Sequence, residues 1–133
     1  LNVRAVMVET SEAVKHMKTG GRLIFIGSAF GARAPFPGIS LYAATKAALR
    51  GFAQGVARDL GPKGITVNVV EPGPIDTDLN PATGEGAKLI SSFVATGAYG
   101  TVQDIASMVS FLASPKAGYI TGAALPVDGG LEA

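Results

Sequence analysis

The sequence predicts an α/β fold with a parallel, doubly wound sheet flanked by helices. Residues 22–27 and 65–70 are apolar without alternation, which is typical of parallel strands that are covered on both faces. Helix-like stretches separate these runs, and this alternation favours parallel strands joined by right-handed crossovers. Three strands are few for such a sheet, and the first would have an unpaired outer edge. We therefore expect the C-terminal half of a larger sheet.

Residues 2–18 are expected to form the first helix, because their apolar side chains recur at the three-four spacing of an amphipathic face. The first strand, residues 22–27, leads into a loop at 28–39 that contains several glycine and proline residues. Gly27 and Gly31 do not have the spacing of a phosphate-binding loop, so that interpretation is rejected.

Ser40 is expected to be the N-cap of a long helix that ends near Leu60. The β-branched run at residues 65–70 then predicts the second strand. One face of the long helix carries small and apolar residues that could pack closely on a sheet or on another helix. These residues are Ala44, Ala48, Phe52, Gly55 and Val56.

The connection at residues 75–100 is long, polar and rich in glycine, and residues 86–96 within it are expected to form a short helix. Loops of this length inside compact domains often act as lids or binding segments. Thr101 begins a further helix, and Asp104 three positions later completes a capping box. Residues 119–127 predict the last strand.

Composition excludes several classes of protein. The 11 Lys and Arg residues, against 10 Asp and Glu, are scattered and form no basic stripe for nucleic acid. With no Cys and one His, neither disulfides nor a metal site are expected. No apolar run approaches the roughly 18 residues of a membrane span, and no segment resembles a signal peptide. We expect a cytoplasmic protein without nucleic-acid or membrane partners, whose 16% charged residues suggest a partly covered surface.

Ser28, Tyr42 and Lys46 are the candidate chemical residues. Tyr42 and Lys46 are four positions apart in a predicted helix, so both side chains lie on one face. A cation fixed beside a phenol favours the phenolate, which suits proton transfer. Ser28 and Pro72-Gly73 both follow strands, where parallel α/β sheets bind ligands. Taken singly, the three residues are equally consistent with a turn cap, a packing aromatic and a surface charge.

Several stretches form a combination of motifs that covers almost the whole chain. They are Asn2, Ile26-Gly27-Ser28, Tyr42-Ala43-Ala44-Thr45-Lys46, the run from Asn68 to Thr77, Ile120-Thr121-Gly122 and Asp128-Gly129-Gly130. With these motifs the chain resembles the short-chain dehydrogenase/reductase family. The resemblance implies a Rossmann-type doubly wound sheet, of which residues 1–133 would be the C-terminal catalytic half, with three strands and flanking helices. The family's glycine-rich turn for the cofactor pyrophosphate is absent from this sequence, so the N-terminal dinucleotide-binding half is expected outside it.

The resemblance also implies a role for each candidate residue. Tyr42 would be the general acid/base that exchanges a proton with the oxygen of a carbonyl or alcohol substrate. Ser28 would hydrogen-bond the same oxygen, so that Ser28 and Tyr42 both bind the substrate. Lys46 would favour the phenolate form of Tyr42 and hold the nicotinamide ribose. Asn2 would support a water-linked proton relay to Lys46.

The implied cofactor is NADP or NAD. The residues expected to bind it are Tyr42, Lys46, Pro72, Gly73, Ile75 and Thr77. The last four of these would contact the nicotinamide and its carboxamide. The family also implies a small-molecule substrate and a homo-oligomer, a tetramer or a dimer, assembled through long helices and C-terminal segments.

Three hypotheses about function follow from these observations. The leading one is an NAD(P)-dependent oxidoreductase that interconverts a carbonyl and an alcohol by hydride transfer. The run Gly73–Pro81 is similar to a bacterial branch described as cyclic-di-GMP-binding biofilm dispersal proteins, so nucleotide sensing on the same fold is an alternative. A further alternative is a fragment of the reductase that is inactive by itself.

Overall fold

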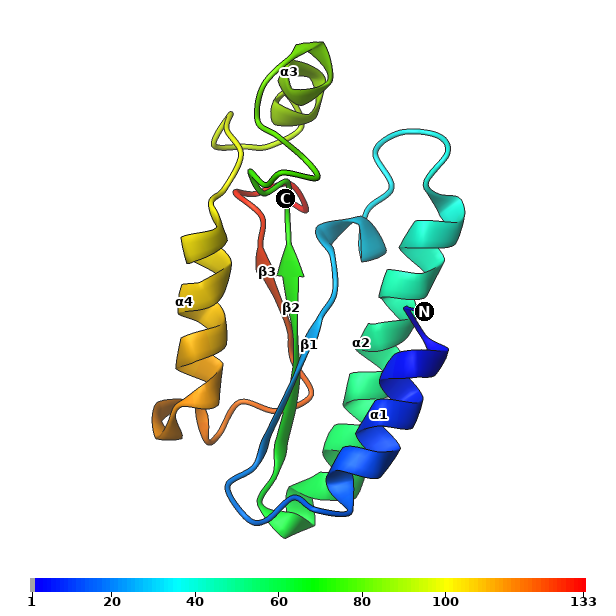
Figure 1. Ribbon diagram of the computed structural model, residues 1–133, viewed down its shortest axis with the longest axis vertical. Coiled ribbons are helices and arrows are strands. Elements are labelled where there is room, and N and C mark those ends of the chain that lie inside the picture. The colour runs from blue at the N-terminus through cyan, green and yellow to red at the C-terminus, as the bar shows by residue number, and fades with distance from the viewer. Residues whose placement is uncertain (1) are drawn as a thin grey trace.

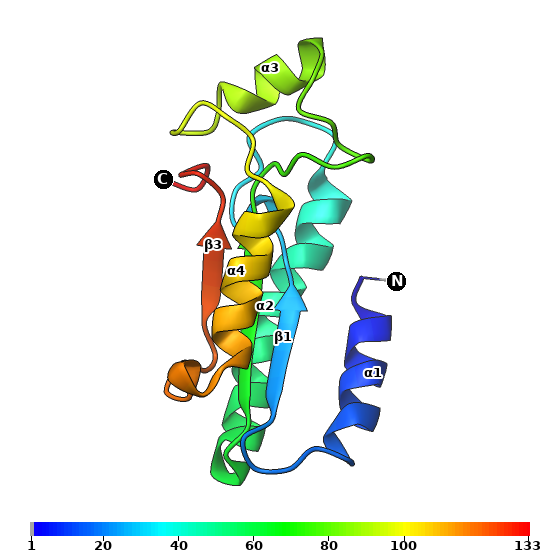
Figure 2. The same ribbon diagram turned by 60° about the vertical axis from the view of Figure 1, so that its left-hand side comes forward.

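The computed structural model describes residues 2–133 and contains one parallel sheet in the order β1-β2-β3. The strands are β1 (Arg22–Ile26), β2 (Thr66–Pro72) and β3 (Ala124–Val127). Figures 1 and 2 show α1 and α2 on one face of the sheet and α4 on the other. The predicted parallel sheet with flanking helices is therefore confirmed, and β1 has no strand on its outer side within the described residues.

The helices are α1 (Arg4–Val14), α2 (Ser40–Leu60), α3 (Glu85–Ser91) and α4 (Val102–Ala113). The first helix is shorter at both ends than the predicted 2–18, and the short helix ends well before the predicted residue 96. Short 3-10 turns lie at Ala29–Gly31, Gly61–Lys63 and Pro115–Ala117. Among residues 2–133, none of the helices has both the length and the apolar character needed to cross a bilayer.

Two predicted helix starts have different outcomes. Ser40 is not an N-cap, because it is already the first helical residue, and Ile39 precedes it without a side-chain cap. Thr101 is the N-cap of α4, as predicted. Its backbone N–H and its hydroxyl both bond the Asp104 carboxylate, at 2.7 Å and 2.8 Å, within the predicted capping box.

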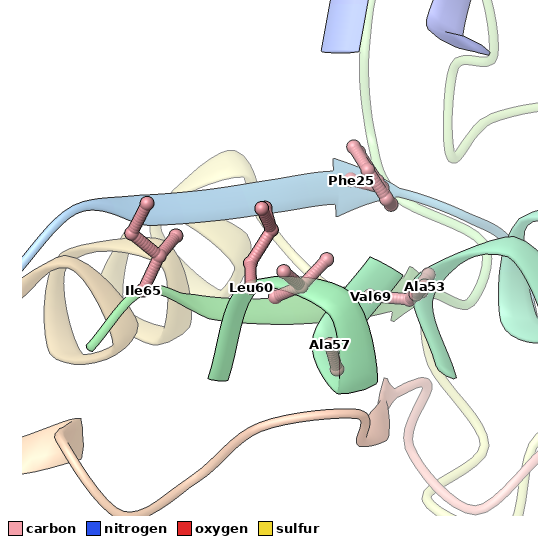
Figure 3. Close-up of a cluster of buried hydrophobic side chains, with 7 residues drawn as sticks. Phe25, Ala53, Ala57, Leu60, Ile65 and Val69 are labelled. Atoms are coloured by element: carbon pink, nitrogen blue, oxygen red, sulfur yellow. The ribbon is translucent and has the colours of Figure 1, made fainter. Parts of the chain in front are cut away.

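The core consists of two apolar layers, one on each face of the sheet. On the α2 face, Figure 3 shows Phe25 and Val69 of the strands meeting residues of α2. On the α4 face, Val70 packs with Leu112. Successive strand residues thus enter opposite layers, which explains why the strands are apolar without alternation. The residues that α2 buries are Leu49, Ala53, Ala57 and Leu60.

The small-residue face predicted for the long helix is only partly used by the sheet. Phe52 and Val56 pack against the core layer, whereas Ala44 and Gly55 are exposed. The sheet is therefore covered mainly by a different stripe of α2.

The predicted strand at 119–127 is shorter in the structure, where β3 begins at Ala124. The preceding residues bond β2 through both backbone and side chains: Gly122 N–H donates to the Val67 carbonyl at 2.7 Å, and the Ala123 carbonyl accepts from Val69 N–H at 2.8 Å. Asn68, which is 1% exposed, donates from Nδ2 to the Ile120 carbonyl at 2.8 Å and accepts from the Ala123 N–H at 3.1 Å. The Asn68 amide therefore supplements the backbone bonds at this point.

Replacing Asn68 with Leu should lower the free energy of unfolding by roughly 2–4 kcal/mol, because one buried carbonyl and one buried N–H lose their partners. Urea unfolding of the full-length protein measures this loss. Thr121→Val is the control, because the exposed Thr121 hydroxyl accepts one bond, from Val67 N at 3.0 Å. Its cost should be about 1 kcal/mol. Equal costs for both variants would contradict the expectation.

Candidate active site

The start of α2 carries Tyr42 and Lys46 to the carboxyl end of β1. The Lys46 ammonium donates to the Ile26 carbonyl at 3.0 Å and lies 5.8 Å from the centre of the Tyr42 ring. A cation within about 6 Å of an aromatic ring is attracted to its face. Lys46 is therefore held between the strand end and the phenol, and Tyr42 remains 42% exposed.

Ser28 directly follows the same strand and is 6% exposed. Its Oγ accepts from the Phe30 N–H at 3.2 Å and so begins the 3-10 turn at Ala29–Gly31. Ser28 is thus a turn cap, as one sequence interpretation held. The Ser28 hydroxyl still has its own O–H donor, and no acceptor among the described residues receives a hydrogen bond from it. Ser28 can therefore cap the turn and, at the same time, donate a hydrogen bond to a ligand.

Gly31 determines how closely the Ser28 turn approaches α2. A methyl group at this position would lie 3.0 Å from Ala47 N and 3.0 Å from the Lys46 carbonyl carbon. Both are backbone atoms of α2, so a side chain here would require the turn or the helix to shift by a few tenths of an ångström. Sequence reasoning considered Gly31 only as part of a phosphate loop and missed this role, because only the packed helix reveals it.

Replacing Gly31 with Ala should lower kcat/KM about tenfold, because the turn must move off α2 by a few tenths of an ångström and Ser28 moves with it. Steady-state kinetics of the full-length protein measures this effect. Gly61→Ala at the far end of α2 is the control, because a methyl group there meets nothing within 4 Å. A Gly31→Ala variant with the kinetics of the Gly61→Ala variant would show that this contact does not position Ser28.

Asn2 reaches the same helix. Its Nδ2 donates to Thr45 Oγ1 at 3.4 Å, and this hydroxyl donates to the Tyr42 carbonyl at 2.8 Å. Asn2 therefore contacts the residue next to Lys46, at the exposed side of α2. The relay between Asn2 and Lys46 stays a prediction.

The segment after β2 lies beside the Ser28 turn. Ile26 pairs with Val70, and Gly27 N–H donates to the Val70 carbonyl at 2.7 Å, so both strands end at one edge of the sheet. Pro72 ends β2, and Gly73 N–H donates to the Val127 carbonyl at 3.0 Å.

Close packing around this segment explains its glycine. A methyl group on Gly73 would lie 2.6 Å from the Asp128 Cα, so only glycine fits there. Further along, Ile75 forms a bridge with Gly100, and Thr77 Oγ1 accepts from Asn80 N–H at 3.1 Å. Four of the predicted cofactor residues, Pro72, Gly73, Ile75 and Thr77, therefore lie in or directly after the end of β2.

A buried ion pair lies under this edge, and sequence reasoning missed it. Glu71 is fully buried on β2, and its Oε1 accepts from Arg50 Nε at 2.6 Å while its other oxygen accepts from Arg50 Nη2. Arg50 Nη2 also bonds Glu132 Oε2 at 3.1 Å. The hydrogen bond to Glu71 raises the pKa of Arg50, whereas burial raises the pKa of the Glu132 carboxyl. Arg50 lies one turn beyond Lys46, so the pair ties α2 to β2.

Comparison with known proteins identifies the family. The family model described as enoyl-(acyl carrier protein) reductase matches residues 1–132. The cyclic-di-GMP-binding biofilm dispersal mediator protein of Escherichia coli (strain K12) is 47% identical over 133 residues, which are 100% of this chain and 56% of that protein. The 3-oxoacyl-(acyl-carrier-protein) reductase FabG of Salmonella typhimurium is 47% identical over 115 residues, 86% of this chain and 47% of that protein. The chain spans about half the length of the curated relatives it matches.

A solved structure agrees with these matches. The crystal structure of a blue fluorescent protein from a metagenomic library, in complex with NADPH, is 54% identical with a TM-score of 0.97, over 99% of this chain and 53% of that chain. This similarity in sequence and backbone confirms the predicted Rossmann-type fold. The short-chain dehydrogenase/reductase from Serratia marcescens BCRC 10948 is 53% identical with a TM-score of 0.98, over 99% of this chain and 54% of that chain. Together with the family match, these similarities show that the chain belongs to the short-chain dehydrogenase/reductase family.

Proposed function

We propose that this chain is the catalytic half of an NAD(P)-dependent oxidoreductase that interconverts a carbonyl and an alcohol. The observation that carries the proposal is the fixed position of Lys46, bonded to the Ile26 carbonyl and lying against the Tyr42 ring. Ser28 follows the same strand end, and this position supports the proposal that a phenol, a hydroxyl and a cation act together there. The similarity to a 3-oxoacyl reductase and to a structure in complex with NADPH supports the reaction class.

The residues present fit a nicotinamide cofactor. Within residues 2–133 the Lys46 ammonium makes one hydrogen bond, so two of its three donors are available for the hydroxyls of a ribose. The cofactor, NADP or NAD, would supply or accept the hydride when it is bound. The residues proposed to hold it are Tyr42, Lys46, Pro72, Gly73, Ile75 and Thr77.

In the proposed mechanism, the residues of this chain handle the proton and the substrate oxygen. Tyr42 donates its phenolic proton to the carbonyl oxygen as negative charge develops there. Ser28 donates a hydrogen bond to the same oxygen and so stabilises that charge. Lys46 stabilises the resulting phenolate, and Asn2 supports return of the proton through water. In alcohol oxidation each step runs in reverse.

The open outer edge of β1 supports the proposal that the dinucleotide-binding half continues this sheet. Ile26 at the end of β1 is 47% exposed, although the strand is apolar. We further propose a cytoplasmic homo-oligomer, a tetramer or a dimer, that acts on a small molecule. Isolated residues 1–133 should bind NADPH only weakly, and nanomolar affinity in calorimetry would contradict the division into halves.

The direct test is an assay of the full-length protein with NADPH and NADH against a panel of ketones and 3-oxoacyl thioesters. We expect oxidation of one cofactor that depends on the carbonyl and yields an equal amount of alcohol. Binding of cofactor without turnover of any carbonyl would contradict the reaction class.

A second function is favoured by the 47% identity to the cyclic-di-GMP-binding relative along the whole chain. Nucleotide sensing on this fold would give a binding protein in place of an enzyme. Calorimetry of the full-length protein with cyclic-di-GMP, beside NADPH as the reference ligand, separates the two functions. Absence of binding heat with cyclic-di-GMP would exclude this second function.

A further inference from the structure

Residues 128–132, which we call the strap, form a rigid turn after β3. The Asp128 carboxylate accepts from Gly130 N–H at 2.9 Å and from Glu132 N–H at 2.8 Å. Gly129 and Gly130 have φ values of +64° and +83°, which only glycine adopts readily. The chain end drawn in red in Figure 1 therefore lies in a defined conformation at the carboxyl edge of the sheet.

Leu131 is the apolar anchor of the strap. It is 1% exposed and packs in a small cluster with the buried residues Ala29 and Val94. Phe30 and Phe93 cover this cluster at its margin. Ala29 and Phe30 belong to the turn that Ser28 begins, whereas Phe93 and Val94 belong to the connection between α3 and α4. One leucine side chain therefore joins two segments that the sequence separates widely.

Polar contacts fasten the strap to the same surroundings. Arg33, just beyond the Ser28 turn, donates from Nη1 to the Leu131 carbonyl at 2.7 Å. Arg50 of α2 bonds the Glu132 carboxylate, with Nη2 to Oε2 at 3.1 Å. The Thr96 N–H donates to the strap's Gly129 carbonyl at 3.0 Å. The three bonds join the strap to three different segments: the loop that follows Ser28, helix α2, and the connection between α3 and α4.

The Ser28 turn is consequently held from two sides. On one side Gly31 rests on the backbone of α2 at Lys46 and Ala47. Elsewhere on the turn, Leu131 packs against Ala29, which follows Ser28 directly and is fully buried. Neither contact involves the Ser28 hydroxyl, so both leave it available to a ligand.

We propose that Leu131 is a positioning residue, which holds the Ser28 turn at the distance from Tyr42 and Lys46 that the reaction requires, and which couples residues 93–97 to that turn. The inference rests on the proposed carbonyl reduction for its kinetic consequence, but not for its structural one. Leu131 acts through Ala29 and Ser28, so its removal should change turnover more than cofactor binding. The coupling also makes the mobility of residues 93–97 depend on the strap.

The test compares Leu131→Ala with Leu112→Ala in the full-length protein. Leu112 is also fully buried, but it lies on α4 and packs with Val70 and Ala117 in a separate cluster on the α4 face of the sheet. Both variants remove the same three carbons from a core site, so both should lose stability. Only Leu131→Ala should accelerate hydrogen exchange in residues 28–33 and 93–97 together. Only this variant should also lower kcat, by about tenfold or more, with little change in KM for NADPH.

Leu131→Met conserves the side-chain volume and should restore most of the turnover. The proposal is overturned if both alanine variants lower kcat by the same factor, or if exchange in the two segments rises only with global unfolding. A wild-type protein that reduces no carbonyl would contradict the proposed function alone. The exchange comparison would then still decide whether Leu131 holds the Ser28 turn and residues 93–97 together.

Discussion

Replacing Tyr42 with Phe should lower carbonyl turnover by about 10²- to 10⁴-fold, the usual contribution of a positioned general acid. The change removes one oxygen from a side chain that is 42% exposed, so stability should change by no more than about 0.5 kcal/mol. The aromatic ring that lies 5.8 Å from the Lys46 ammonium is kept, so Lys46 should stay in place. Steady-state kinetics, thermal unfolding and calorimetric binding of NADPH measure the three expectations separately.

Leu41→Ala is the matched control for Tyr42→Phe. Leu41 is the preceding residue on α2 and is 83% exposed, so its truncation should leave turnover unchanged. Carbonyl reduction that survives undiminished in Tyr42→Phe would show that another group donates the proton. A loss that is matched by weaker NADPH binding would instead indicate that Tyr42 mainly holds the cofactor.

Replacing Arg50 with Met should lower the free energy of unfolding by about 3 kcal/mol or more, because an uncompensated carboxylate remains buried. Glu71 is fully buried, and both of its oxygens accept hydrogen bonds from Arg50. Urea unfolding near neutral pH measures the loss.

Two further variants separate the buried charge from simple loss of packing. The double variant Arg50→Met with Glu71→Met replaces the pair by apolar side chains and should recover most of the lost stability. Glu132→Gln keeps the Arg50–Glu71 pair and should cost less than about 1 kcal/mol, because Glu132 is partly exposed. An Arg50→Met variant as stable as its parent would mean that water or another group compensates Glu71.

The parallel sheet could be predicted because the apolar residue types of its strands reflect burial on both faces of the sheet. Phe25 and Val69 face the α2 layer while Ile24 and Val70 face the α4 layer, so both strands carry apolar residues at successive positions. The last strand was predicted too long because apolar residues from 119 onward resemble a strand. Gly122 and Ala123 still make backbone bonds to β2, and the Asn68 amide binds Ile120 and Ala123 beside them, which residue types alone do not report.

The candidate site was likewise predictable only in part from the sequence. Tyr42 and Lys46 lie on one helix, so their spacing alone predicts that they are neighbours. Ser28 follows an apolar strand, and ligand sites in parallel sheets lie at that end. Gly31, the Arg50–Glu71 pair and Leu131 act through contacts between distant segments, and no local pattern reports such contacts. The predicted N-cap at Ser40 failed for a related reason, since the actual start of α2 depends on how the preceding loop enters the helix.

By itself, the sequence determined the residue types of the proposed proton-transfer site and the order of the elements that carry them, because periodicity and strand ends are local properties. The tertiary structure alone decided how those residues are held. Gly31 rests on the backbone of α2, and Leu131 packs against Ala29 next to Ser28. The physical reason is close packing: the position of a hydroxyl depends on the shapes that meet around it, and these come from segments far apart in the chain.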